Sequence, residues 1–174
     1  MKILAVPTRL IESGDDLAVV LRESLPQPLT EHSVLIVTSK VLAVAQGRVR
    51  NVADDAEFAA LVAEEADAVL GRHPQLDLWL TQKDGFVLPN AGIDRSNARP
   101  GTAILLPQHC QHEADALRRR LQQEYGLREL GVVIADSRII PFRRGISGLA
   151  LAWSGFIGVR DERGKADLYG KPLL

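Results

Sequence analysis

Two short segments of this 174-residue chain place an aspartate, a hydroxyl side chain and an arginine close together after an apolar run. They are Asp94, Arg95 and Ser96 near the end of residues 85–97 (GFVLPNAGIDRSN), and Asp136, Ser137 and Arg138 directly after residues 130–135. Carboxylate oxygens suit magnesium or manganese, and such ions commonly bridge phosphate groups. The pattern therefore favours a cation site shared by the two aspartates. For the first segment an Asx-type turn, in which the polar side chains satisfy only their own backbone, is the alternative.

A third polar group, Thr38, Ser39 and Lys40, follows the apolar residues 34–37 and opens a helical segment that Gly47 ends. Backbone N–H groups at such a point, together with the lysine cation, could contact phosphate. A helix cap with a solvated lysine is the other interpretation, and the sequence leaves both open. His109, Cys110 and His112 resemble a zinc knuckle, but no second ligand pair occurs at a suitable spacing, so we do not expect zinc.

The apolar patterning predicts the elements that must position these groups. Strands are expected over residues 2–6, 34–37, 76–81, 102–106, 130–135 and 147–159, with residues 34–37 buried on both faces. Helices are expected up to Arg22 with Ser13 as the cap, from Asp54 to about residue 70 with Gly71 as the stop, and over residues 111–125. The first strand lacks a following G-x-G-x-x-G turn, and helices and strands do not alternate regularly. We therefore expect an α+β fold with mixed sheets flanked by helices.

The composition narrows the class of protein. With 21 basic and 22 acidic residues, the chain has no charge excess that would attract nucleic acid or a membrane surface. The single cysteine, Cys110, excludes an internal disulfide and fits a reducing compartment. Residues 1–7 are too short for a signal peptide, and no apolar run has membrane-spanning length. A soluble cytoplasmic protein is the expectation.

Several segments, in order, resemble the coenzyme F-420:L-glutamate ligase family. They are LIESGDDLA from Leu10, VLIVTSKVLAVAQGRV from Val34, GFVLPNAGIDRSN, LLP from Leu105, VVIADS, PFRRG from Pro141 and DERGKADLYG from Asp161. The resemblance implies a GTP-dependent enzyme that joins L-glutamate to a carboxylate, such as that of a deazaflavin, through an acyl phosphate, with magnesium or manganese. It also implies an intertwined homodimer of one ligase-like unit over residues 1–174, or of two interleaved lobes without a clean linker.

The resemblance also implies roles for individual residues. The metal ligands would be Asp94, Asp136 and Ser137; the nucleotide contacts would be Thr8, Arg9, Leu10, Ile11, Ser39, Lys40 and Asn97; Arg143 is a candidate phosphate contact. No catalytic side chain is assigned. Val44 and Ile140 replace a lysine and an arginine of the family, Ile146 replaces a glutamine, and family members continue beyond the position of Leu174. These departures favour an alternative, a shortened non-catalytic relative that binds nucleotide or metal or has a structural role.

Overall fold

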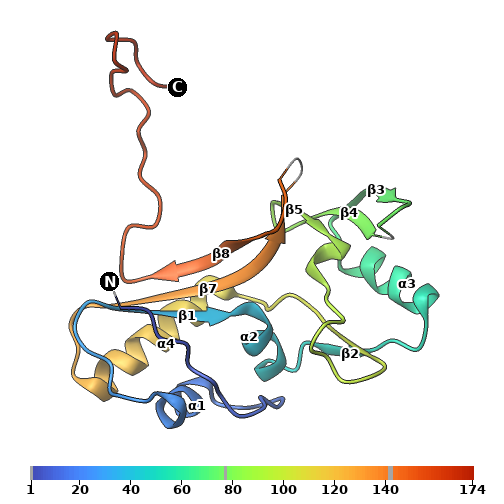
Figure 1. Cartoon of the computed structure of the whole chain (residues 1–174), viewed down its shortest axis with the longest axis horizontal. Helices are drawn as coiled ribbons and strands as arrows, with labels where there is room; N and C mark the ends of the chain where they lie inside the picture. Colours follow the sequence, from blue (N-terminus) through green and yellow to red (C-terminus); the bar gives the residue numbers. More distant parts are fainter. Residues whose placement is uncertain (1, 77, 141–142) are drawn as a thin grey trace.

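A computed structural model describes residues 2–76, 78–140 and 143–174 of the chain (Figure 1). The helices are α1 (Leu17–Ser24), α2 (Ser39–Ala45), α3 (Asp55–Glu65) and α4 (Cys110–Tyr125), with a 3-10 turn, η1 (Asn90–Gly92). The strands are β1 (Ser33–Thr38), β2 (Val49–Asn51), β3 (Ala68–His73), β4 (Leu78–Lys83), β5 (Phe86–Pro89), β6 (Thr102–Ile104), β7 (Leu130–Ile139) and β8 (Ile146–Ser154). The expected α+β fold with mixed sheets is confirmed, since β1 pairs with β7 in parallel and every other pair of named strands is antiparallel.

The first sheet has the order β1-β7-β8, and α4 packs on β7 and β8 with α1 against it. On β1, Leu35 and Val37 are buried in this core, whereas Val34 and Ile36 are 56% and 68% exposed. The prediction that residues 34–37 are buried on both faces was therefore wrong. Among the described residues the helices cover only one face of this sheet, and apolar side chains remain on the other.

A second apolar cluster gathers around α3, the turn η1 and β6. Asp54 caps α3 as predicted, because its carboxylate accepts hydrogen bonds from the N–H groups of Ala56 and Glu57. The helix ends at Glu65, earlier than predicted, because residues 68–73 pair with β4 as strand β3. Gly71 lies at a register shift in that strand and does not stop the helix.

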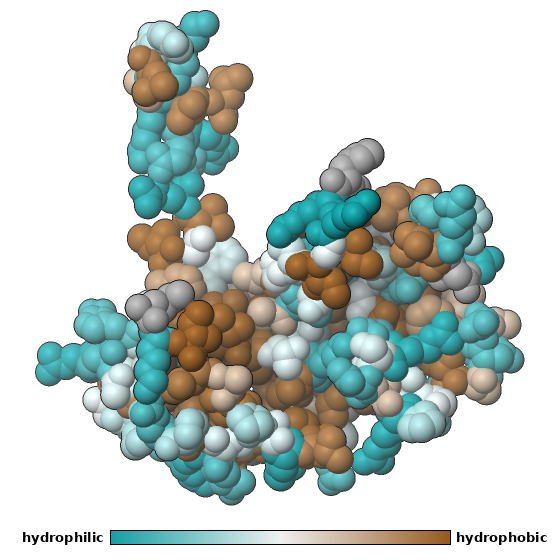
Figure 2. Space-filling model, in the orientation of Figure 1, coloured by the Kyte–Doolittle hydropathy of each residue, from teal (hydrophilic) through white to brown (hydrophobic). Residues whose placement is uncertain are grey.

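The chain termini differ from the sequence-based expectation. Residues 2–6 form no strand, and α1 is capped by Asp16 instead of Ser13. Strand β8 ends at Ser154, and residues 156–174 form an arm that leads away from the body (Figure 1) and carries both hydrophilic and hydrophobic residues (Figure 2). Helices in the described part of the chain are all too short or too polar to cross a membrane.

The remaining predicted elements are present with shifted bounds: residues 76–81 correspond to β4, 102–106 to β6, and 111–125 to α4. Asp77, within the first of these ranges, lies outside the described residues, as do Met1 and the residues Pro141 and Phe142 of the PFRRG segment.

Candidate functional site

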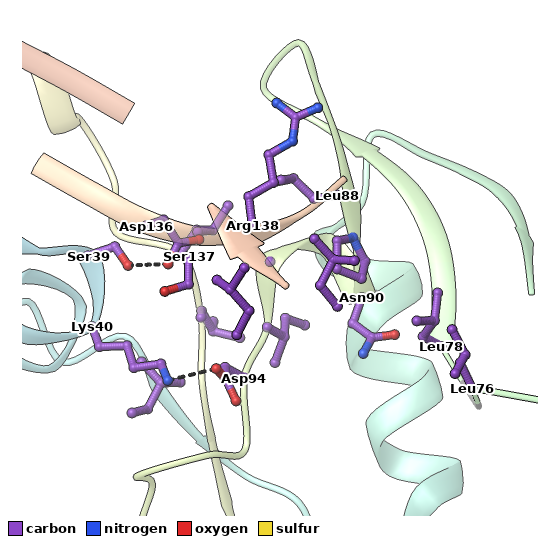
Figure 3. Close-up of a pocket in the computed structure, with 18 residues that line it drawn as sticks. Ser39, Lys40, Leu76, Leu78, Leu88, Asn90, Asp94, Asp136, Ser137 and Arg138 are labelled. Carbon is purple, nitrogen blue, oxygen red and sulfur yellow. Dashed lines mark hydrogen bonds and ion pairs between the residues drawn. The ribbon is translucent and has the colours of Figure 1, made fainter. Parts of the chain in front are cut away.

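A cavity of about 350 Å³ lies where the start of α2, the end of β7 and the segment from β5 to Asp94 meet (Figure 3). Its charged and hydroxyl-bearing lining residues are Ser39, Lys40, Asp94, Asp136, Ser137 and Arg138. The apolar part of the lining includes Leu78, Leu88, Ile104, Leu106, Ile139 and Ile146. Three polar groups that are distant in the sequence therefore share one cavity, and a cation shared by Asp94 and Asp136 stays a prediction.

The Asp136 side of the cavity is fixed by the parallel pairing of β1 and β7. Thr38 lies opposite Ala135, so the next residues of the two segments, Ser39 and Asp136, come together. The Ser39 hydroxyl, 2% exposed, donates a hydrogen bond to Asp136 Oδ1 at 2.7 Å. Among the described residues nothing hydrogen-bonds Oδ2, so that oxygen is available to a ligand. Sequence patterning placed Asp136 after a strand, whereas β7 continues past it to Ile139.

The Asp94 side of the cavity is held by Lys40. Lys40 Nζ lies 2.7 Å from Asp94 Oδ2 and donates a hydrogen bond to Ser96 Oγ at 2.7 Å. The Ser96 N–H donates to Asp94 Oδ1 at 2.6 Å, which is the Asx-turn hydrogen bond considered as the alternative. The carboxylate of Asp94 therefore forms the Asx turn and also pairs with the ammonium group of Lys40, whereas a divalent cation at this position stays a prediction.

These contacts determine the charge state of Asp94. Partial burial acts to raise the pKa of its carboxyl, but the hydrogen bonds from Lys40 and Ser96 lower it more. The pKa therefore lies below the ordinary value, and Asp94 is an anion at neutral pH. The ionised carboxylate of Asp94 can pair with another cation in place of the ammonium group of Lys40.

The backbone that delivers Asp94 is a tight turn, as the residues Pro89, Asn90 and Gly92 predicted. The residues of η1 all have positive φ, with values of 52°, 52° and 73°. A side chain on Gly92 would meet Leu106, whose Cγ would lie 2.5 Å from the added Cβ, so only glycine fits without a shift. After the turn, the backbone of Asp94 exchanges two hydrogen bonds of 2.9 Å with Ile104.

Other residues named from the sequence are not among the lining residues: Thr8, Arg9, Leu10, Ile11, Asn97 and Arg143. Arg9 forms two hydrogen bonds with the carboxylate of Asp15, at 2.7 and 2.8 Å. Asn97 and Arg143 are exposed. Nucleotide or phosphate contacts at these positions remain predictions.

Ser96, which shares Lys40 with Asp94, was named in the first polar segment but was assigned no role in the site. Its position two residues after Asp94 was the signal in the sequence that could have identified it, because a hydroxyl there lies next to the carboxylate. Ile146 stands where related proteins were expected to carry glutamine, and with Ile139 it gives this side of the cavity an apolar wall.

Comparison with known proteins gives a consistent result over nearly the whole chain. A family model described as F420-0:Gamma-glutamyl ligase matches residues 5–174. A coenzyme F420:L-glutamate ligase of Methanopyrus kandleri is 36% identical over 192 residues, covering 99% of this chain and 74% of that protein. The protein of the same name from Archaeoglobus fulgidus is 36% identical over 180 residues, covering 94% of this chain and 70% of its own length. The protein of the same name from Methanothermobacter thermautotrophicus is 30% identical over 182 residues, covering 94% of this chain and 72% of its own length.

Proposed function

Because the chain belongs to the F420-0:gamma-glutamyl ligase family of enzymes, we propose that it joins L-glutamate to the carboxylate of a deazaflavin coenzyme precursor, with GTP as the phosphoryl donor and magnesium or manganese as the cofactor. The observation that carries this proposal is the pair of carboxylates, Asp94 and Asp136, lining one cavity beside Lys40. Anionic oxygens for a cation and an ammonium group for phosphate are the components that phosphoryl transfer needs.

The residues present fit a divalent cation that is completed by its substrate. The described residues contain no group of three or more His, Cys, Asp or Glu side chains able to hold a metal alone. Magnesium is commonly held by one or two carboxylates together with substrate phosphates and waters. Asp94 and Asp136 would supply the carboxylates, and the hydroxyl of Ser137 is a further candidate ligand. The bound cation would neutralise charge on the phosphates.

The proposed reaction has two steps. An oxygen of the acceptor carboxylate attacks the γ-phosphorus of GTP, so that GDP leaves and an acyl phosphate forms. The amine of L-glutamate then attacks the acyl carbon, an amide bond forms, phosphate leaves and the amine gives up a proton to solvent. The protein contributes positioning and charge: Lys40 faces the phosphates, and the apolar wall of Ile139 and Ile146 restricts water near the acyl phosphate.

A turnover assay with the purified full chain tests the proposal. With the deazaflavin precursor, L-glutamate, GTP and manganese, we expect GDP release matched by a product heavier by one glutamyl residue. Asp94→Asn and Asp136→Asn each remove a charged contact. Losing such a contact costs about 1.5–3 kcal/mol, so we expect turnover to fall roughly ten- to hundredfold. Asp84→Asn, in the exposed β4–β5 turn, removes the same charge away from the cavity and should leave turnover unchanged.

The outcomes of this assay separate the candidate functions. Turnover with ATP in place of GTP shows which of the two nucleotides is the phosphoryl donor. Metal-dependent nucleotide binding without a glutamylated product would support the alternative, a non-catalytic relative. Equal turnover in wild type and Asp136→Asn would show that the site is misplaced.

We also propose a homodimer. The apolar face of β1 carries the exposed side chains Val34 and Ile36, and the arm carries Ile157 and Leu168, which are 88% and 98% exposed. Contact with a second copy would remove this apolar surface from water. Light scattering at micromolar concentration should give twice the chain mass for the wild type and a smaller mass for Ile36→Lys; a wild-type monomer would contradict the proposal.

A further inference from the structure

The turn before Asp94 adopts a backbone conformation that must be held in place. Asn90 and Ala91 both have φ of 52°, in the left-handed region that residues with a Cβ rarely adopt. Ala91 is also buried, at 1% exposure, so water cannot satisfy its N–H group. Such conformations persist where surrounding contacts determine them.

The contacts that hold this turn come from β4, and the hydroxyl oxygen of Thr81 makes two of them. Its hydroxyl donates a hydrogen bond to the carbonyl of Leu88 at 2.6 Å and accepts one from the N–H of Ala91 at 2.8 Å. Thr81 is 0% exposed, and it lies opposite Leu88 in the β4–β5 register. The hydroxyl therefore connects the end of β5 to the middle of the turn, in a place that water does not reach.

A third hydrogen bond fixes the same turn from β4. The side-chain carbonyl of Asn90 accepts from the N–H of Trp79 at 2.8 Å. Beyond the turn, Ile93 donates its N–H to the carbonyl of Asn90, and Asp94 then pairs with Ile104. Only Ile93 lies between Gly92 and Asp94, so a displaced turn would displace the carboxylate.

We propose that Thr81 is a positioning residue for the reaction: its hydroxyl holds the turn 90–92 and thereby sets where the Asp94 carboxylate stands in the cavity. The consequence for ligand binding rests on the proposed function, whereas the effect on the backbone does not. Valine at position 81 has nearly the shape of threonine but lacks the hydroxyl, and serine retains it.

Amide hydrogen exchange of the unliganded protein tests the backbone effect. In Thr81→Val we expect the amides of Ala91 and Asp94 to exchange at least tenfold faster than in wild type, and Thr81→Ser to restore most of the protection. Ser154→Ala removes a buried hydroxyl that does not line the cavity and donates to Asp115, and it should leave both amides unchanged. Unchanged exchange at Asp94 in Thr81→Val would overturn the proposal.

The affinity for manganese and GTP tests the consequence for ligand binding. It is measured by calorimetry on folded protein, well below the melting temperature. We expect about tenfold weaker binding for Thr81→Val and wild-type binding for Ser154→Ala. Because Thr81 acts through Asp94, adding Thr81→Val to Asp94→Asn should cause no further loss. A further tenfold loss in the double variant would overturn the positioning role. Absence of binding by the wild type would instead contradict the proposed function, and the exchange experiment would still decide the role of Thr81.

Discussion

Gly92→Ala tests the structure of the turn that delivers Asp94. The structure gives two separate reasons why alanine is disfavoured there. The first is the φ of +73°, which lies in the left-handed region. The second is the added Cβ, which would lie 2.5 Å from Leu106 Cγ and 2.6 Å from its Cδ1, much closer than van der Waals contact.

The two reasons can be given approximate magnitudes. Alanine in the left-handed region costs about 1–2 kcal/mol, and inserting a methyl group into a packed site costs about 1–3 kcal/mol. Gly101 isolates the first term, because its φ is +74° and nothing lies within 4 Å of an added Cβ. Gly92→Ala should therefore destabilise the fold by about 1–3 kcal/mol more than Gly101→Ala.

Urea unfolding of both variants measures this difference, provided that the denaturant dependence of the unfolding free energy stays constant. A double variant, Gly92→Ala with Leu106→Ala, should recover the packing term as a favourable coupling energy, since the second substitution removes the atoms that clash. Equal destabilisation by Gly92→Ala and Gly101→Ala, with no coupling to Leu106, would refute the close approach of Gly92 and Leu106.

Three further predictions concern charged groups. Lys40→Met should raise the pKa of the Asp94 carboxyl from its lowered value, as measured by NMR titration, because the ammonium group favours the anion; an unchanged pKa would show that the pair does not form. The guanidinium of Arg9, together with the N–H of Glu12, lowers the pKa of Asp15 to about 2, so these contacts stabilise the fold fully above the unfolded-state pKa of about 3.9 and lose that effect as pH falls through 2. The stability difference between wild type and Arg9→Gln should therefore be larger at pH 5 than at pH 2, and a pH-independent difference in urea midpoint would contradict this. Asp16→Ala should cost about 0.5–2 kcal/mol in urea unfolding through loss of the α1 cap, and a smaller effect would place the cap elsewhere.

Local patterns predicted the elements well where a single property determines them. The carboxylate of Asp54 marked the start of α3, and the apolar spacing over residues 111–125 marked α4. The end of α3 was misjudged because the apolar residues 68–70 continue a helical spacing, yet they pair with β4. Residues 2–6 have strand-like composition but pair with no described strand, and composition alone cannot supply a partner.

The residues that line the cavity were predictable only in part, and their contacts were not predictable. Asp94 and Asp136 were recognisable from the residue types around them. The hydrogen bond between Ser39 and Asp136 depends on the parallel pairing of β1 with β7, which joins residues 97 positions apart. Thr81 had no recognisable feature in the sequence, because its role depends on a hydrogen bond to a turn ten residues later.

The two carboxylates of the cavity are held with different strength. Lys40 and Asp94 are 27% and 43% exposed, and an ion pair in such a position contributes about 0–1 kcal/mol. Asp136 is held by the buried hydroxyl of Ser39, and breaking such a bond costs about 1–3 kcal/mol when a buried group is left unsatisfied. If a cation binds as proposed, it would therefore replace Lys40 at Asp94 more readily than it would displace Ser39 from Asp136. In the proposed function, the same exchange releases the ammonium group of Lys40, which then contacts the phosphates that arrive with the cation. Asp136 is therefore the fixed part of the site, and Asp94 with Lys40 is the part that rearranges.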